Sequence, residues 1–416
     1  MRSLFLSLAL ALIGGAAHAQ ALPQWGYARS GTCDGYPRAV IQTIPGMCAG
    51  LVLAPPPTGL PLSKRTIRMP RSLLPLANGD LLVSDLGAWT TGRGAVWRVT
   101  PRPGGEPVIK PMLRRLDMPH TLAVGPDGKV YVGEMSRISR FDPDAADPQA
   151  TLTPVVTGLP DNRLHENRHP LSAFVWAADG AFLVNVGAPS DQCPPPLSKK
   201  GGAGQKTCPE AERQAAIWRF APAGPGKWAA EPTVHARGLR NSLALIRTRA
   251  GTVLQAENSI DVPQANWPPE ELNVITAGAH YGWPYCMGAN EPAPAWRAQR
   301  VACAPYRRPD LLLPPHGAPL DLVEYRGAMF PDLQGRLLVS LHGYRPAGSR
   351  ILAIELTDKG LPKPGQKPRD LTPGWGAVKG KRPAGAPVGM AVAGDGAIWV
   401  ADDRNGAILR FAKDRR

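Results

Sequence analysis

The sequence lacks most of the short motifs that identify common enzyme classes. It has no Cys-x-x-Cys spacing, which argues against zinc ribbons, thioredoxin-type redox sites and covalent haem attachment. It also has no Gly-x-Ser-x-Gly elbow, no phosphate-binding P-loop and no Gly-x-Gly-x-x-Gly fingerprint. Serine hydrolases of the elbow type and nucleotide-dependent enzymes therefore gain no support from motifs.

Long apolar runs are also missing, apart from one at the N-terminus. Residues 4–13 are apolar, follow Arg2 and precede an Ala-His-Ala sequence at 17–19. This is the layout of an export signal with an A-x-A cleavage site, and the run is too short to span a bilayer. We therefore expect residues 1–19 to be a signal peptide, the mature chain to begin at Gln20, and the protein to be periplasmic without a membrane span.

The six cysteines all lie downstream of this signal. They form three sequence-local pairs, Cys33 with Cys48, Cys193 with Cys208, and Cys286 with Cys303. An even number of cysteines in an exported chain predicts disulfides. Each bridge closes a loop of roughly 15 residues, which the chain-entropy model values at about 3 kcal/mol.

The chain is strongly basic, with a formal net charge of +15. Such a charge is compatible with nucleic-acid or anionic-membrane binding. The basic residues are scattered, however, and export removes the protein from cytoplasmic nucleic acid, so we expect no nucleic-acid partner. An anionic cofactor or an acidic electron acceptor suits a basic surface better.

Glycine (45 residues) and proline (47 residues) exceed a fifth of the chain, and long amphipathic helical patterns are absent. Six segments repeat one pattern, a glycine turn, a short apolar strand, a polar turn and a second strand. They start at Leu76, Gly125, Ala177, Thr248, Asp332 and Ala393. Asn-Gly and Asp-Gly supply the positive φ of tight hairpin turns, and the runs that follow are rich in β-branched and aromatic residues.

Six such units, unevenly spaced, predict an all-β, six-bladed β-propeller with inserted loops. We expect residues 20–416 to form one domain, with an N-terminal extension over residues 20–60 that includes the extended Pro55-Pro56-Pro57 run. The longest insertions lie around residues 185–215 and 256–330. Loops inserted on one face of a propeller commonly build its site.

Residues 238–284 carry three short blocks in a fixed order. The blocks are Gly238-Leu239-Arg240-Asn241, Glu271-Leu272-Asn273 and Tyr281-Gly282-Trp283-Pro284. With the six repeats, they make the chain resemble the soluble quinoprotein glucose/sorbosone dehydrogenases, whose equivalent blocks surround pyrroloquinoline quinone (PQQ) and calcium. The resemblance implies oxidation of an aldose or related sugar, with electrons passed to a soluble or membrane acceptor.

The resemblance assigns catalytic roles to two residues. His169 matches the general base that takes the proton of the sugar hydroxyl, a task that suits an imidazole. Arg240 matches the cation at the reactive quinone carbonyl, where a guanidinium stabilises developing negative charge. On the residues alone, His169 could instead cap a loop beside Pro170, and Arg240 could be a surface residue of a turn.

His165 is a reserve candidate for the base. With Glu166 and His169 it also fits the His-Glu-x-x-His spacing of zinc enzymes. That motif needs a helix to bring both histidines to one face. Pro160 and Pro170 on either side predict a loop instead.

The resemblance also implies the residues that hold the cofactors. PQQ carries three carboxylates, which require cations and other polar side chains around them. The residues in these positions would be Arg71, His120, Arg240, Asn241, His342, Arg345, Lys381 and Arg382. Calcium would bind the backbone carbonyls of Ser259 and Ile260, which stand where the family has a Gly-Pro pair. Tyr281 and Trp283 would either form a wall over the quinone or sugar ring, or pack between blades.

Two rival functions come from other classes. One is a non-catalytic propeller that binds ligands without quinone, for which the missing Gly-Pro pair is the main support. The other is a metal-dependent sugar lactonase, which would require acidic and amide ligands near the axis. Glu134, Asn185 and Asp402 are the candidates for that set.

Overall fold

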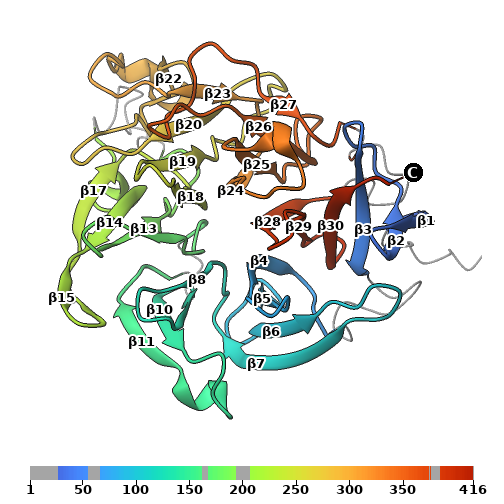
Figure 1. Cartoon of the computed structure of the whole chain (residues 1–416). Helices are drawn as coiled ribbons and strands as arrows, with labels where there is room; N and C mark the ends of the chain where they lie inside the picture. The colour runs from blue at the N-terminus through green and yellow to red at the C-terminus, as the bar shows by residue number, and fades with distance from the viewer. Residues whose placement is uncertain are drawn as a thin grey trace, which may run out of the picture.

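The computed structural model describes residues 27–54, 66–161, 167–193, 207–373, 375 and 385–415. Its strands form six antiparallel sheets arranged around a central axis, with two additional two-stranded hairpins (Figure 1). This is the six-bladed β-propeller that the repeats predict. The signal peptide at 1–19 and the Pro55-Pro56-Pro57 run lie outside the described residues.

Each blade is built mainly from consecutive strands. Blade one contains β4 (Pro70–Pro75), β5 (Leu81–Asp85), β6 (Gly94–Thr100) and β7 (Val108–Leu116). Blade two contains β8 (Leu122–Val124), β9 (Val130–Gly133), β10 (Arg137–Phe141) and β11 (Thr153–Thr157). Blade three contains β12 (Phe174–Trp176), β13 (Phe182–Val186), β14 (Ala216–Phe220) and β17 (Thr233–Arg237).

The second half of the ring follows the same plan. Blade four contains β18 (Ala244–Arg247), β19 (Val253–Glu257), β20 (Glu270–Val274) and β23 (Leu311–Leu313). Blade five contains β24 (Pro319–Glu324), β25 (Leu337–Leu341), β26 (Arg350–Ile354) and β27 (Arg369–Asp370). Blade six contains β28 (Pro387–Val392), β29 (Ile398–Asp402), β30 (Ala407–Lys413), β3 (Met47–Leu53), β2 (Tyr36–Ala39) and β1 (Arg29–Cys33).

Short elements lie between these strands. The two small hairpins are β15 (Pro222–Gly224) with β16 (Lys227–Trp228), and β21 (Cys286–Met287) with β22 (Glu291–Pro292). The 3₁₀ helices are η2 (Pro148–Thr151), η3 (Pro209–Glu212), η4 (Pro294–Gln299) and η5 (Pro331–Leu333). No helix in the described ranges has the length and apolar character needed to cross a bilayer.

The glycine turns of the repeats join the first strand of each blade to the second. In blade one, Gly79 has a φ of 88°, and its N–H donates to the carbonyl of Leu76 at 3.0 Å. Gly128 and Gly396, at the same point of blades two and six, have φ values of 76° and 89°. Residues with a Cβ disfavour this region, which explains why Asn-Gly and Asp-Gly recur there.

Residues 27–54, the described part of the predicted N-terminal extension, supply β1, β2 and β3 to the last blade. Met47 pairs with Lys413 at one end of β3, and Leu53 pairs with Ile408 at the other. Almost all of β3 is buried. Without β3 the outer edge of β30 would be unpaired, and open strand edges are prone to aggregation. The strand carries no glycine-turn repeat, so the pattern did not reveal it.

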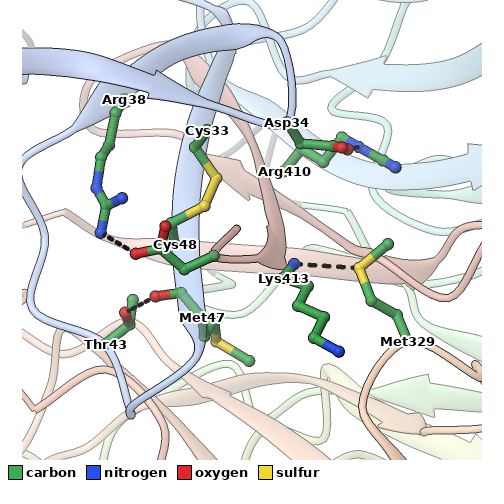
Figure 2. The surroundings of a disulfide bond; sticks show 10 residues. Cys33, Asp34, Arg38, Thr43, Met47, Cys48, Met329, Arg410 and Lys413 are labelled. Atoms are coloured by element: carbon green, nitrogen blue, oxygen red, sulfur yellow. Dashed lines mark hydrogen bonds and ion pairs between the residues drawn. A yellow bond between two sulfur atoms is a disulfide. The ribbon is translucent and has the colours of Figure 1, made fainter. Parts of the chain in front are cut away.

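The three predicted disulfides are present, Cys33–Cys48, Cys193–Cys208 and Cys286–Cys303. Cys33–Cys48 joins β1 to β3 (Figure 2). Beside it, Arg410 of β30 donates from Nε to the carboxylate of Asp34 at 2.8 Å. A covalent bond and an ion pair therefore fasten the N-terminal hairpin to the blade that it completes.

The core consists of apolar clusters within and between neighbouring blades. Tyr131 of blade two and Phe182 of blade three, for example, lie with ring centroids 5.8 Å apart. The first strands of adjacent blades also contact one another around the ring, as β28 does with β4 and β24. The loops at one end of these inner strands therefore meet at the axis, where they form the site.

Candidate active site

A cavity of about 400 Å³ lies where the starts of the first strands meet the ends of the second strands. Five of the six blades contribute to its lining. The polar and aromatic lining residues are Arg71, Trp89, Arg168, His169, Asn241, His342, Tyr344, Asp403 and Arg404. A concave pocket with convergent charged groups is the usual form of a ligand site.

His169 lines this cavity from the loop before blade three. Its Nδ1 lies 2.6 Å from the carbonyl oxygen of Ala188. Because a carbonyl only accepts hydrogen bonds, Nδ1 carries the proton and Nε2 keeps a free lone pair. Burial, together with the positive charge of Arg240, lowers the pKa of His169 to about 3. The side chain is therefore a neutral imidazole at physiological pH, and its Nε2 is unprotonated.

Gly187 packs closely against the Cβ and backbone of His169. A Cβ at that glycine would lie 2.4 Å from the Cβ of His169, so the close approach requires glycine. The backbone N–H of His169 also donates to Oδ1 of Asn167 at 3.0 Å. The described part of this segment, from residue 167, is irregular and not helical. The helix that the zinc motif requires is absent from the described part of this segment. His165 and Glu166 lie outside the described residues.

An ion-pair network also borders the cavity. Arg71, which is 2% exposed, forms an ion pair through Nη1 with Asp403. Nε2 of His342 lies 2.8 Å from the other oxygen of Asp403. Burial disfavours ionisation of Asp403, but the charges of His342 and Arg71 outweigh it and lower its pKa to about 2. One carboxylate thus positions two of the predicted cofactor-binding residues.

His120 lies behind this network. Its Nδ1 accepts a hydrogen bond from Nε of Arg71 at 3.3 Å. Burial and the adjacent Arg71 charge hold the pKa of His120 well below its usual value, so the ring is neutral. His120 therefore supports Arg71, and it is not among the residues that line the cavity.

Asn241 reaches the cavity from the loop before blade four. Its backbone N–H donates to Oε1 of Glu257 at 3.2 Å. Its side-chain Oδ1 is buried and has no hydrogen-bond partner among the described residues. Buried polar atoms are rarely left without a partner. This oxygen is the orphaned acceptor that a bound ligand or water would satisfy.

Arg240 lies behind His169 and not in the cavity lining. Its guanidinium donates to the side chain of Asp191 at 2.6 Å and to the carbonyl of Asn258 at 2.9 Å. Its own carbonyl accepts from the N–H of Ala188, whose carbonyl holds His169. In this structure Arg240 therefore positions the histidine and lowers its pKa, while its donors are directed to protein acceptors.

Ser259 and Ile260, the predicted calcium ligands, lie at the edge of blade four. The N–H of Ser259 donates to Oε2 of Glu270 at 2.6 Å, and Ile260 is buried against Trp283. Glu257, Glu270 and Glu271 are all buried nearby, and burial raises their pKa values to about 8, 7 and 7. No basic side chain in the described ranges forms an ion pair with these three carboxyl groups.

The remaining predicted residues fall elsewhere. Arg345 donates to the carbonyls of Val262 and Gln264, so it anchors the inserted loop to blade five. Lys381 and Arg382 lie outside the described residues. Tyr281 and Trp283 are buried and pack in apolar clusters, so the packing alternative holds for both.

The structure does not bring together Glu134, Asn185 and Asp402, the candidate metal ligands of a lactonase. Glu134 forms a two-pronged ion pair with Arg137, and Asp402 accepts from Asn405 and Ala386. Asn185 bonds to backbone groups of its own and the next blade. None of the three lines the cavity. The one metal-like group among the described residues, Cys193, Cys208 and Glu210, contains a disulfide, whose sulfurs are not thiolate ligands.

Sequence reasoning missed several lining residues, namely Trp89, Arg168, Tyr344, Asp403 and Arg404. A signal existed for Asp403, because it follows β29 just as His342 follows β25. Aligning the ends of the second strands across repeats would have found it. Arg168 and Trp89 lie in loops that the repeat pattern does not cover.

A family model described as Glucose / Sorbosone dehydrogenase matches residues 132–410. An uncharacterised protein of Borreliella burgdorferi is 30% identical over 181 residues, which cover 42% of this chain and 47% of that protein. The chain thus spans about half the length of the curated relative that it matches.

Several solved structures share the fold over nearly their full length. The PQQ domain of Coprinopsis cinerea pyranose dehydrogenase, in its holo form, is 21% identical with a TM-score of 0.67, covering 92% of this chain and 100% of that one. The PQQ-bound aldose sugar dehydrogenase of Streptomyces coelicolor is 19% identical with a TM-score of 0.55, covering 90% and 100%. The apo aldose sugar dehydrogenase of Escherichia coli is 13% identical with a TM-score of 0.57, covering 88% and 100%.

Proposed function

Because the chain belongs to the glucose/sorbosone dehydrogenase family, we propose that it is an exported, periplasmic quinoprotein that oxidises an aldose or related sugar with PQQ and calcium. The observation that carries the proposal is the geometry of His169. A neutral imidazole with a free Nε2 lines a cavity that is bordered by cations from several blades.

The cavity suits PQQ in charge and in hydrogen bonding. PQQ carries three carboxylates, and Arg71, Arg168, His342 and Arg404 border the space. The partnerless Oδ1 of Asn241 offers an acceptor to a ring N–H of the cofactor. When bound, PQQ supplies an electrophilic quinone that accepts a hydride from a sugar carbon.

The chain's own residues then handle the proton. Nε2 of His169 accepts the proton of the sugar hydroxyl while the adjacent carbon loses hydride, so the sugar loses two electrons and two hydrogens in total. The Ala188 carbonyl holds Nδ1–H and stabilises the imidazolium that forms. Arg240 fixes Ala188 and, by its charge, favours rapid loss of that proton to solvent.

Calcium is proposed at the carbonyls of Ser259 and Ile260. Oxygen donors are the ligands that calcium prefers. Three buried carboxyl groups of blade four lie near this point, and Glu270 accepts a hydrogen bond from the N–H of Ser259. Burial disfavours their charged form, and a bound cation would favour it. An ion held there would offset the cost of burying those groups.

The test begins with apo protein titrated with PQQ at equilibrium, with and without calcium. We expect PQQ to bind, and chelation of calcium to weaken its binding, since two ligands that contact each other bind with mutual assistance. His169→Ala should retain PQQ affinity but lower sugar turnover by about 100-fold or more. His235→Ala, a half-buried histidine on β17 away from the cavity, is the matched control and should keep turnover within about twofold of wild type.

PQQ affinity that is unaffected by calcium removal would show the calcium site to be wrong. Normal turnover of His169→Ala would remove the assigned base. If His165→Ala then abolishes turnover, the base is the earlier histidine.

A further inference from the structure

Blade one carries a second hollow beside the central cavity. It has a volume of about 760 Å³ and is more open than the cavity, with four arginines in its lining, Arg68, Arg93, Arg114 and Arg115. We refer to it as the arginine groove. It plays no part in the chemistry described above.

Three of the four arginines of this groove have no carboxylate partner among the described residues. Arg93, Arg114 and Arg115 are exposed and form no ion pair with any carboxylate in the described ranges. Arg114 lies with its guanidinium 5.1 Å from the ring centroid of Trp97. Asp85, the acidic residue of the lining, is 2% exposed, and its oxygens accept hydrogen bonds from the N–H groups of Met69, Gly87 and Trp97. Asp85 therefore does little to neutralise the positive charge that a ligand in the groove would meet.

One short loop separates the groove from the cavity. In the β5–β6 loop, Trp89 lines the cavity, while Gly87 and Arg93 line the groove. Gly87 has a φ of 67°, and a Cβ there would lie 2.0 Å from the carbonyl oxygen of Arg93, so the loop closes tightly on itself. Trp89 is 58% exposed. An exposed tryptophan beside exposed arginines has the composition of a protein-binding hot spot.

We propose that the arginine groove and Trp89 form the docking surface for an acidic one-electron carrier protein. The proposal rests on the proposed function. Oxidation of one sugar yields two electrons and two protons, so each turnover reduces two carriers and releases both protons to solvent. The groove places such a carrier one loop away from the cavity. The net charge of +15 attracts acidic partners over a longer range.

The test uses plastocyanin, an acidic blue-copper protein, as the probe carrier. Binding of oxidised plastocyanin is measured by titration calorimetry on the holoprotein without sugar, at low ionic strength. We compare wild type with a triple variant, Arg93→Gln, Arg114→Gln and Arg115→Gln, and with Arg102→Gln. Arg102 is an exposed arginine at the opposite end of the β6–β7 hairpin, so Arg102→Gln removes charge from the same blade away from the groove.

We expect wild type to bind the probe with an affinity that falls as salt rises. The triple variant should bind at least about tenfold more weakly, while Arg102→Gln should stay within about twofold. Each single Arg→Gln variant provides the same comparison if the triple variant fails to fold. No binding by wild type, equal binding by the triple variant, or an equal loss with Arg102→Gln would overturn the proposal.

A kinetic arm separates this proposal from the proposed function. Sugar oxidation is followed with plastocyanin and with uncharged benzoquinone as acceptors. The ratio of the plastocyanin rate to the benzoquinone rate should fall at least about tenfold in the triple variant. Absence of turnover with benzoquinone in wild type would refute the proposed function, whereas an unchanged ratio would refute the docking surface alone.

Discussion

The cavity side of blade six and the interior of blade four both bury acidic side chains, but the pKa values of these side chains shift in opposite directions. Asp403 meets Arg71 and His342, and its pKa falls to about 2. Glu257 forms no ion pair in the described ranges, and burial, with the nearby Glu271, outweighs the charge of Arg240 and raises its pKa to about 8. The comparison shows that burial alone does not decide the charge of a carboxyl group. The neighbouring charges do.

The difference also separates two tasks. Blade six holds the carboxylate of Asp403, which fixes Arg71 and His342 at the cavity. Blade four holds carboxyl groups that are close to neutral until a cation arrives, which suits a region proposed to receive calcium. Both arrangements predict how mutation and pH should change stability.

The largest expected effect comes from breaking the blade-six network. Asp403→Ala leaves Arg71 buried without its carboxylate, and removal of one partner of a buried pair costs about 3–5 kcal/mol. Denaturant unfolding of the apo protein measures this loss. Asp144→Ala, which removes an 82% exposed carboxylate that lies 3.6 Å from Arg98, should cost at most about 0.5 kcal/mol. A loss for Asp403→Ala as small as that of Asp144→Ala would refute the network's structural role.

The next effect concerns alkaline pH and blade four. The folded-state pKa of Glu257, about 8, lies above the unfolded value of 4.5, so its contribution is present at low pH and is lost as pH rises through 8. Each unit of pKa difference equals about 1.4 kcal/mol, so the apo protein should lose a few kcal/mol between pH 5 and pH 9. Glu257→Gln should flatten this profile when measured by denaturation with a chelator present. Parallel profiles for the two proteins would contradict the assignment.

A smaller effect is expected on the acid side, from His169. Its folded-state pKa of about 3 lies below the unfolded value of 6.5, so the unfolded chain binds more protons between these limits. Stability should fall as pH decreases through that window, by about 2 kcal/mol between pH 7 and pH 5. His169→Gln should remove this part of the acid sensitivity. Equal acid sensitivity in both apo proteins would mean that His169 is not held neutral.

Much of the fold was predictable because it depends on local chemistry. Gly79 and Gly396 mark turns that require positive φ, and the strands beside them follow from β-branched residues. Strand β3 was not predictable this way, because it pairs with β30 across almost the whole chain length. Its role depends on ring closure and not on any local pattern.

The features of the site also divide into those predicted from the sequence and those that depend on long-range contacts in the fold. The family resemblance predicted His169, Asn241, His342 and Arg71 as site residues, and all four line one cavity. The surroundings of Arg240 were not found, since its partner Asp191 lies 49 residues earlier and reaches it only after folding. The role of Asp403 as a shared partner of Arg71 and His342 likewise depends on three blades meeting at the axis.

The most direct test of the central claim is anaerobic, single-turnover reduction of the quinone. Holoprotein loaded with PQQ and calcium is mixed with an excess of aldose, and the quinone absorbance is followed over time. The account predicts that the spectrum changes to that of the reduced quinone in wild type, and at least about 100-fold more slowly in His169→Ala with the same amount of PQQ bound. A bound quinone whose spectrum stays oxidised in wild type, across a panel of aldoses and related sugars, would contradict the account.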